Sequence, residues 1–595
     1  MPHIITLMKH LLAIFLMLFF WACQSNQAPN QSNQSTKNTT HNKKSALLTY
    51  RNHSEILANI PELTAFRQAI TSALQQKQPV ILYPDDELKL QYLKFAEAEA
   101  LKNKEFTAQL FLPQSREPLL NMILDIRAPK PSELRKNKIQ GDLAMVEMYN
   151  FYYNTVVHAF LDKTTQKVVK VSSAPGTQPN LTKKLQKLAT KIAMAYPDVQ
   201  QQLGISNGQV TPQFNIKVRN SKSERFRHLC AAVTITPKGA KETLWVLVDL
   251  TTLKGVGFQW MPLWNPKRPQ LVTERSLQNE VITESYCSDT IRLERNNWVI
   301  HYQLTNSDGI EIFDASYHGK LVLKSAKLVD WHVSYPDKKD FGYSDAMGCP
   351  KFSSAAVVAF EPPDIQPIMK GRQEVGFSFI QDFRSPVWPK ACNYRYQNLF
   401  EFYADGRFRI AGVNLGLGCS NNGWYRPVFR INLADKKGQS IASWQDGNWK
   451  KWDTENWLLQ KDKSNFSPQG YQFKITNADG SGYYLEPNQG QFGDHSHGDH
   501  AYTFVTVEHL GKGEGEQDMP TLGPCCNTNF EQGPEQFLTP AEPLNGHNII
   551  WYVPQMKNSD KKGKQYCWVE TRVENGHEGY QTYNGVVGPM FVPFP

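Results

Sequence analysis

The feature that most constrains this fold is the C-terminal part of the chain, where nearly every segment has a strand pattern. From residue 267 onward, runs such as NNWVIHYQL, IEIFDASY, EVGFSFI and YTFVTVEHL alternate apolar and polar residues between Gly, Asn, Asp and Pro. Period-two alternation is typical of strands with one buried face. No helix-period segment of useful length appears there, so we expect residues 270–595 to form one large antiparallel β-sandwich.

Composition supports a large globular protein and excludes one class of partner. The chain has 595 residues, of which 40% are hydrophobic and 12% aromatic, enough for several domains with sizeable cores. No motif repeats at a fixed period, which argues against a β-propeller. The net charge is +9, but the Lys and Arg residues are scattered rather than concentrated. Nucleic acid is therefore not an expected partner.

The first half of the chain mixes helix and strand patterns in two groups. In the first group, helices are expected over residues 53–83 and 90–102. Strands are expected on either side of a basic turn at 129–138, over residues 106–113, 119–126 and 143–162. In the second group, helical periodicity from Thr182 to Leu203 precedes the strands FNIKV, AAVTITP and TLWVLVDLTT. The sequence thus predicts two small α+β modules, over residues 53–170 and 171–265.

The N-terminus has the pattern of an export signal. Lys9 and His10 precede the apolar run LLAIFLMLFFWA, which is too short to cross a bilayer, and Cys23 follows directly. This order resembles a bacterial lipoprotein signal, in which residues 1–22 are removed and Cys23 is lipidated. The alternative is an ordinary secretory signal that is cut nearby. In both cases the mature chain is exported, and a lipid anchor is the only membrane attachment expected. The polar tract after Cys23 predicts a disordered tether over residues 23–52.

Cysteine usage agrees with export. The chain has nine cysteines, and an even number remains when Cys23 is set aside. An even count in an exported protein indicates disulfides, although the sequence leaves their pairing open. No CxxC motif occurs, so a zinc ribbon or a thioredoxin-type site is not expected.

Several stretches, in this order, resemble the copper/topaquinone amine oxidases. KLVLKSAKLVDWHVSYPD resembles that family's strand pair before a tight turn, and NIIWYVP resembles a late strand of its catalytic domain. The most specific stretch is Asn393-Tyr394-Arg395-Tyr396, followed after eight residues by Asp405-Gly406, which keeps the spacing around the family's quinone-forming Tyr. The resemblance covers about residues 53–595. It implies two small α+β domains before a β-sandwich, and a homodimer.

The resemblance also implies a chemistry. The family deaminates primary amines oxidatively to aldehyde, ammonia and hydrogen peroxide, with copper and topaquinone as cofactors. Tyr394 takes the position of the Tyr that becomes the quinone. The family's general base falls on Gly342 in a gapless match, and Asp340 and Asp345 flank it. Asp345 is the candidate base. The alternative for each carboxylate is a solvated residue of a turn.

The copper ligands of the family have no counterpart at the matching positions. Two of the three His ligands fall on Gly423 and Tyr425, and no His occurs between His332 and His495. The third ligand should follow NIIWYVP, where the chain has QMKNSDKKGKQYCWV. Gly has no donor atom, and a phenol is a rare copper ligand. Arg395 also stands where the family has an acid, and we expect it to pair with a carboxylate.

A separate cluster offers another possible metal site. In FGDHSHGDHAY, His495 and His497 are two residues apart and would share one face of a strand, and His500 follows. His500 or an Asp, Asp494 or Asp499, would complete the ligand set of a Zn²⁺ or Cu²⁺ ion. The alternative is a solvated His- and Asp-rich loop. The cluster lies on the wrong strand to replace the family's copper site.

Two functions follow from these observations. The chain is either a non-catalytic exported binding or scaffold protein that kept the fold, or an exported primary-amine oxidase with an unconventional metal site. Because quinone formation requires bound copper, the missing imidazoles favour the first function. We therefore expect Tyr394 to be buried in the sandwich core and to remain unmodified.

Overall fold

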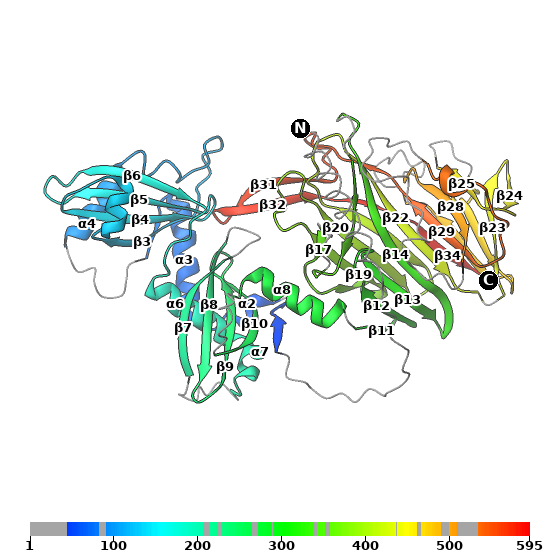
Figure 1. Ribbon diagram of the computed structural model, residues 1–595, viewed down its shortest axis with the longest axis horizontal. Coiled ribbons are helices and arrows are strands. Elements are labelled where there is room, and N and C mark those ends of the chain that lie inside the picture. Colours follow the sequence, from blue (N-terminus) through cyan, green and yellow to red (C-terminus); the bar gives the residue numbers. More distant parts are fainter. Residues whose placement is uncertain are drawn as a thin grey trace, which may run out of the picture. The chain divides into compact units, whose positions relative to one another are not determined.

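The computed structural model describes most of the chain after the N-terminal segment (Figure 1). The described residues are 44–595, apart from 51, 83–90, 206–213, 223–227, 264–271, 288, 338–341, 352–356, 436, 461–465, 489–498 and 510–532. Cys23 and the predicted signal peptide lie outside the described residues. Within them, no helix is long and apolar enough to cross a membrane.

The first α+β module is a five-stranded sheet with helices against it. Its strand order is β2-β3-β4-β5-β6, with bounds Val80–Ile81, Asn121–Arg127, Leu143–Asn150, Thr155–Asp162 and Val168–Pro175. The helices α3 (Pro61–Gln76), α4 (Gln91–Lys102) and α5 (Pro131–Asn137) precede or interrupt these strands, whereas the short helix α2 (His53–Ile56) contacts the second module, where His53 Nδ1 lies 2.8 Å from the Tyr196 hydroxyl. α4 packs on β3 and β4 (Figure 1).

The second module is also a five-stranded sheet, but its first strand comes from before the first module. The order is β1-β10-β9-β8-β7, with bounds Ser45–Leu47, Lys254–Pro262, Glu242–Asp249, Leu229–Pro237 and Phe214–Lys222. One face is covered by the amphipathic helix α6 (Lys183–Ala195), which α7 (Pro197–Gln202) follows. Ser45–Leu47 therefore forms a strand where the sequence predicts tether.

Three other local expectations are corrected. Residues 106–113 are turns, with a single bridge at Phe111, rather than a strand. The basic stretch at 129–138 contains the short helix α5, which begins at Pro131, a residue favoured in the first turn. A helix, α8 (Glu274–Ile282), also occurs after residue 267, where the sequence predicts only strands. Thr273 caps its N-terminus, because the Thr273 side chain accepts a hydrogen bond from the Ser276 backbone N–H.

The first sheet of the sandwich is built around two long neighbouring strands. β14 (Lys320–Ser334) pairs with β22 (Trp424–Leu433), and the order is β11-β12-β13-β14-β22-β29-β28-β25. β15 (Gly342–Asp345) pairs with β14, and β30 (Met556–Lys557) pairs with β22. The other bounds are Ile291–Arg295, Trp298–Leu304, Ile310–Tyr317, Asn548–Val553, Tyr502–Val507 and Asn456–Leu459 for β11, β12, β13, β29, β28 and β25.

The second sheet carries the Tyr394 segment. Its order is β16-β17-β19-β20-β21-β34-β27-β26-β23-β24, with β18 beside β19 and β33 beside β21. The strands around the segment are β19 (Gln373–Arg384), β20 (Arg395–Tyr403) and β21 (Phe408–Asn414). The other bounds are Met347–Gly348, Val357–Ala359, Asp364–Lys370, Gly585–Val587, Met590–Phe594, Gly482–Glu486, Phe473–Asn477, Gln439–Gln445 and Asn448–Lys451 for β16, β17, β18, β33, β34, β27, β26, β23 and β24.

One apolar core lies between these two sheets. It combines inward residues of both, such as Trp331 and Phe429 from the first sheet with Phe400 and Phe591 from the second. The remaining strands form a separate hairpin of β31 (Trp568–Glu574) and β32 (His577–Tyr583), and a short 3-10 turn spans Glu535–Phe537. The predicted fold class, α+β modules followed by a large antiparallel β-sandwich, is confirmed.

Two disulfides connect parts of the C-terminal half. Cys287 pairs with Cys349, and Cys392 pairs with Cys419. Cys567 is a buried thiol. The expectation of disulfides is confirmed for these two pairs, which are typical of proteins from oxidising compartments. Cys525 and Cys526 lie outside the described residues.

Candidate functional site

Tyr394 lies in the sandwich core at the start of β20. Its side chain is 4% exposed and belongs to the core between the two sheets. Its backbone is fixed to Ser385, which follows β19: the Tyr394 N–H donates to Ser385 Oγ, and its carbonyl accepts from the Ser385 N–H. The predicted burial of Tyr394 is confirmed, and the β19–β20 connection is what holds the ring there.

The Tyr394 hydroxyl is enclosed by protein groups. It lies 2.7 Å from the Tyr335 hydroxyl and 3.4 Å from Cys419 Sγ, part of the disulfide to Cys392. The Tyr335 oxygen also accepts the Cys419 backbone N–H at 2.9 Å and lies 3.4 Å from the Tyr425 hydroxyl. Three phenols from three different chain segments therefore share one hydrogen-bonded group. We call Tyr335, Tyr394, Tyr396 and Tyr425 the phenol cluster.

The rings are also stacked in a row. The Tyr394 and Tyr396 ring centres are 5.5 Å apart with planes at 9°. The two residues are two positions apart, so their side chains lie on the same face. Tyr396 stacks in turn on Trp331 of β14, with centres 4.3 Å apart and planes again at 9°. This row ties the start of β20 to the opposite sheet, so Tyr394 has little freedom to change its orientation.

Asp345 contacts this row. It is the last residue of β15 and is 7% exposed, and the Tyr396 hydroxyl donates to its Oδ2 at 2.9 Å. Burial, with a smaller contribution from the charge of Asp330, raises the pKa of Asp345 to about 7. The interpretation of Asp345 as a solvated turn residue is therefore wrong. Gly342 begins the same strand, and Asp340 lies outside the described residues.

The positions that match copper ligands are filled by phenol rings. A Cβ added at Gly423 would lie 2.9 Å from Tyr335 Cε1 and 2.9 Å from the Tyr425 hydroxyl, closer than real Cβ contacts. Tyr425 is fully buried, and burial raises its pKa well above the ordinary value. A phenol must lose its proton to bind copper well. The residues present therefore do not fit the imidazole site that the resemblance implies.

The region of the third ligand position holds sulfur instead of imidazole. Met556 of β30 lies opposite Tyr425 in the sheet, and the Cys567 thiol donates to Met556 Sδ at 3.5 Å. Both side chains are fully buried, and burial raises the pKa of Cys567 well above its usual value. The pair is a neutral thiol and a thioether. Among the described residues, no group of three or more His, Cys, Asp or Glu side chains is arranged to hold a metal ion.

Arg395 has a structural role, as expected. Its Nε donates to Asp382 Oδ1 at 2.7 Å, and its guanidinium lies 4.9 Å from the centre of the Trp388 ring. Arg384 donates to the other carboxylate oxygen of Asp382. Two guanidiniums therefore share one buried carboxylate beside Tyr394, and the charge reversal in the motif is compensated locally.

The His cluster of the sequence is only partly described. His495 and His497 lie outside the described residues, so a metal site there stays a prediction. His500 accepts a hydrogen bond from Gln555 through its backbone carbonyl. Asp499 is fully buried, and its Oδ2 accepts the Tyr552 hydroxyl and the Asn488 and Gly588 backbone N–H groups. That carboxylate therefore joins strands together.

Sequence reasoning missed two parts of the site. It did not single out Tyr335, although this residue ends the recognised stretch KLVLKSAKLVDWHVSY. It also left open the Cys392–Cys419 pair, which encloses the Tyr394 hydroxyl. The signal for the pair is its position, because Cys392 is two residues before Tyr394 and Cys419 is four residues before Gly423.

Comparisons with known proteins find similar solved structures, but only at low identity. No family model matches the chain, and no curated protein matches it. The solved structures that resemble it include a copper-containing benzylamine oxidase from Hansenula polymorpha, with 12% identity, 82% of this chain and 95% of that chain covered, and a TM-score of 0.29. An amine oxidase from Aspergillus nidulans has 13% identity, 86% and 90% coverage, and a TM-score of 0.29. The lysyl oxidase of Pichia pastoris has 10% identity, 86% and 91% coverage, and a TM-score of 0.28. Similarities this low carry no argument about the function of this chain, which must be inferred from its own residues.

Proposed function

We propose that this chain is a divergent relative of the copper amine oxidases that acts outside the cytoplasm as a non-catalytic binding or scaffold protein. The observation that carries the proposal is the packing at Gly423, where the rings of Tyr335 and Tyr425 occupy the space an imidazole would need. The disulfides and the N-terminal Cys23 pattern support an exported, lipid-anchored chain.

The phenol cluster gives the physical reason. In the family, copper binds the Tyr oxygen and brings dioxygen to its ring. Here the Tyr394 oxygen lies against the Tyr335 hydroxyl and a disulfide sulfur. Burial raises the pKa of Tyr335 and of Tyr425, so both hold their protons near neutral pH. Protonated phenols are poor copper ligands, and the cluster therefore favours an unmodified Tyr394.

Two observations favour the alternative, an active primary-amine oxidase with an unconventional metal site. Cys567 and Met556 place two sulfur atoms beside Tyr425, and soft sulfur ligands bind Cu(I). Asp345 has a pKa of about 7, which suits a general base near neutral pH. Without a quinone these groups have no partner in that chemistry, and the test is therefore aimed at the quinone.

The test loads the purified protein with copper under air and looks for the quinone. We expect no visible quinone absorbance, no quinone stain and no peroxide from primary amines, in the wild type and in Tyr394→Phe alike. A copper-dependent absorbance that disappears in Tyr394→Phe, together with peroxide release, would establish the oxidase. Cys567→Ser would then show whether the sulfur pair takes part, because its loss should lower copper content in step with the absorbance.

A further inference from the structure

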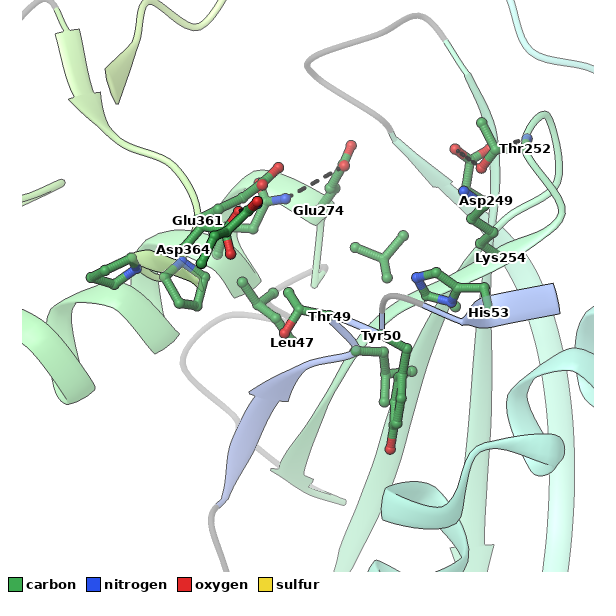
Figure 2. Close-up of a pocket in the computed structure, with 17 residues that line it drawn as sticks. Leu47, Thr49, Tyr50, His53, Asp249, Thr252, Lys254, Glu274, Glu361 and Asp364 are labelled. Carbon is green, nitrogen blue, oxygen red and sulfur yellow. Dashed lines mark hydrogen bonds between the residues drawn. The ribbon is translucent and has the colours of Figure 1, made fainter. Parts of the chain in front are cut away.

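A cavity of about 740 Å³ shares no residue with the phenol cluster, but its carboxylates already have partners (Figure 2). Its walls come from β1 and the segment after it, the turn between β9 and β10, the helix α8, and the segment 361–366 at the start of β18. The protein itself provides a partner for each lining carboxylate, in the pairs Asp249–His228, Glu274–Gln278, Glu361–Arg384 and Asp364–Gln366. The cavity therefore gives no sign of the ligand that it would take.

The outer face of the second sheet has a more specific feature, a strip of five aromatic side chains. In the strands that carry it, residues such as Ile441, Ile475 and Leu485 belong to the core, so the alternate positions face outward. All five rings are half-buried. We call them the aromatic strip: Trp444 of β23, Trp449 of β24, Tyr471 before β26, Tyr484 of β27 and Phe594 of β34.

The rings of the aromatic strip contact one another. The ring centres of Trp444 and Trp449 are 5.2 Å apart, and Trp449 lies 5.7 Å from Tyr484. Tyr471 is parallel to Tyr484, with centres 4.6 Å apart and planes at 4°, and Phe594 also lies 4.6 Å from Tyr484. These contacts restrict the rotation of each ring. A surface that is already ordered loses little conformational entropy when a ligand binds.

Two lysines lie beside the strip. Lys474 of β26 is opposite Tyr484 in the sheet, and its ammonium group is 4.8 Å from the centre of the Phe594 ring. Lys451 of β24 is on the same face, because Ala442 of β23 pairs with Lys451 on one side and with Lys474 on the other. The small Ala442 side chain leaves space between the two ammonium groups, which can therefore approach one anion together.

The carboxylates on this face do not occupy the space between the lysines. Asp453 lies 3.7 Å from Lys451, but both side chains are exposed, so water screens this contact. Burial and then the charge of Glu486 raise the pKa of Tyr471, whereas Arg407 lowers it, so Glu486 and Arg407 lie together at the Tyr471 end of the strip. Positive charge is therefore concentrated around Ala442.

A pocket of about 330 Å³ continues the same face. Its lining includes Lys451, Ser440 and Thr476, and most of its lining side chains are polar. Ser440 pairs with Thr476, which pairs with Gly482, and Gly482 pairs with Phe594, so one row of the sheet connects the pocket to the aromatic strip. The volume is within the range of small-molecule sites, roughly 300–1,000 Å³.

Rings, lysines and a polar pocket together match the surface of an acidic sugar chain. A sugar ring presents carbon-bound hydrogens on its faces, which pack on aromatic side chains, and hydroxyl groups at its edge, which form hydrogen bonds. A uronic acid adds a carboxylate, which an ammonium group attracts and hydrogen bonds. A chain of such sugars can contact the strip, the lysines and the pocket at the same time.

We propose that this face binds an acidic polysaccharide. Its sugar rings stack on the aromatic strip, a uronate carboxylate binds between Lys474 and Lys451, and a neighbouring sugar enters the pocket. The face shares no residue with the phenol cluster. The assignment therefore goes beyond the proposed function and holds whether or not Tyr394 is modified.

The test is titration calorimetry of the purified protein with three acidic hexasaccharides: hexamers of galacturonate, of mannuronate, and of alternating glucuronate and N-acetylglucosamine. Each is compared with its methyl ester, which keeps the sugar rings and loses the charge, and with hexaglutamate, which has carboxylates and no sugar ring. At least one acidic hexamer should bind. Its methyl ester and hexaglutamate should both bind about tenfold more weakly or less, because each lacks one of the two kinds of contact.

The variants separate the rings from the charge. Trp449→Ala should weaken the acidic hexamer about tenfold, and Trp449→Phe, which keeps a ring, should recover most of that loss. Lys474→Met should weaken the acidic hexamer about tenfold and leave the methyl ester unchanged. The matched controls are Trp457→Ala, at a half-buried position in the first sheet, and Lys370→Met, at an exposed position on β18, and both should bind like the wild type.

Three results would overturn the assignment. The first is binding of none of the acidic hexamers at millimolar concentration. The second is equal affinity for an acidic hexamer and its methyl ester, or for an acidic hexamer and hexaglutamate, which would indicate an acidic protein instead. The third is an equal loss in the controls and in the strip variants. Tyr394→Phe should bind the hexamer unchanged, so a quinone at Tyr394 would contradict the proposed function without affecting this result, and absence of binding would do the reverse.

Discussion

The carboxyl group of Asp345 shows how a single residue couples the core to pH. It accepts the Tyr396 hydroxyl at 2.9 Å and is otherwise enclosed by the sandwich. Its pKa of about 7 in the folded chain compares with an ordinary value of 3.8. The pKa values of Asp330 and Asp499 are also raised, to about 6 and about 7, chiefly by burial. Several carboxyls of the sandwich thus hold protons in mildly acidic solution.

This difference predicts a stability that falls as pH rises. Between pH 4 and pH 7 the unfolded chain loses the Asp345 proton while the folded chain keeps it, so the folded state is favoured at the acidic side of that window. For this group alone, the free energy of unfolding should decrease by about 3 kcal/mol from pH 5 to pH 8. Asp345→Asn keeps an oxygen for Tyr396 and does not ionise, so it should reduce the decrease by at least about 1 kcal/mol.

Urea unfolding at the two pH values measures the effect. Asp405→Asn, in an exposed turn, is the matched control and should leave the pH dependence as in the wild type. If the free energy of unfolding decreases by the same amount in Asp345→Asn and in the wild type between pH 5 and pH 8, the buried carboxyl is not the titrating group.

At the scale of elements, the segment before β22 and the phenol rings beside it restrict which side chains each position can hold. The stretch from Leu415 to Gly423 connects β21 to β22, and the disulfide from Cys419 to Cys392 holds it beside Tyr394. A Cβ at Gly418 would lie 1.9 Å from the Tyr425 hydroxyl, and a Cβ at Gly423 would touch the same ring. Glycine is required at both positions because the phenols occupy the space.

The packing predicts that an imidazole cannot simply be restored. Gly423→His should destabilise the protein by about 3 kcal/mol or more, since the new side chain must displace Tyr335 or Tyr425 from a close-packed core. Asn421→His, an exposed position in the same segment, should change stability by less than about 0.5 kcal/mol. Urea denaturation compares the two. A Gly423→His variant as stable as Asn421→His would show that the site has room for a ligand and would favour the oxidase.

Elements also show where sequence reasoning succeeds and where it fails. The period-two strands of the C-terminal half are predicted well, because each has one face in the core. α8 was missed because it is short, yet Thr273 before it and the spacing of Leu277, Val281 and Ile282 were available as signals. Residues 106–113 have a strand pattern but turn back through a bridge between Phe111 and Pro118, and only tertiary contacts decide this.

At the scale of the whole molecule, the order of the parts is what the sequence predicts best. Two α+β sheets precede two large antiparallel sheets. The site is predicted less completely: the burial of Tyr394 and the pairing of Arg395 follow from the motif. The hydroxyl partners of Tyr394 do not, because Tyr335 and Cys419 approach it from distant segments. Such contacts depend on register between strands, which a single sequence does not specify.

The whole-molecule prediction concerns anchoring. If Cys23 is the lipidated N-terminus, radiolabelled fatty acid should be incorporated into the wild type and lost in Cys23→Ala. Cys567→Ser is a suitable control, because its buried thiol gives no access to an acylating enzyme. Equal labelling of wild type and Cys23→Ala would contradict the anchor and favour an ordinary secretory signal.

The row of rings from Trp331 through Tyr396 to Tyr394 has an optical consequence. Its planes are nearly parallel at close spacing, and its last member touches a disulfide. Aromatic groups held rigidly in an asymmetric core produce near-ultraviolet circular dichroism, which disappears when side-chain packing is lost even if the strands remain. The near-ultraviolet circular dichroism of this row should therefore report loss of packing between the two sheets before the strands of either sheet separate.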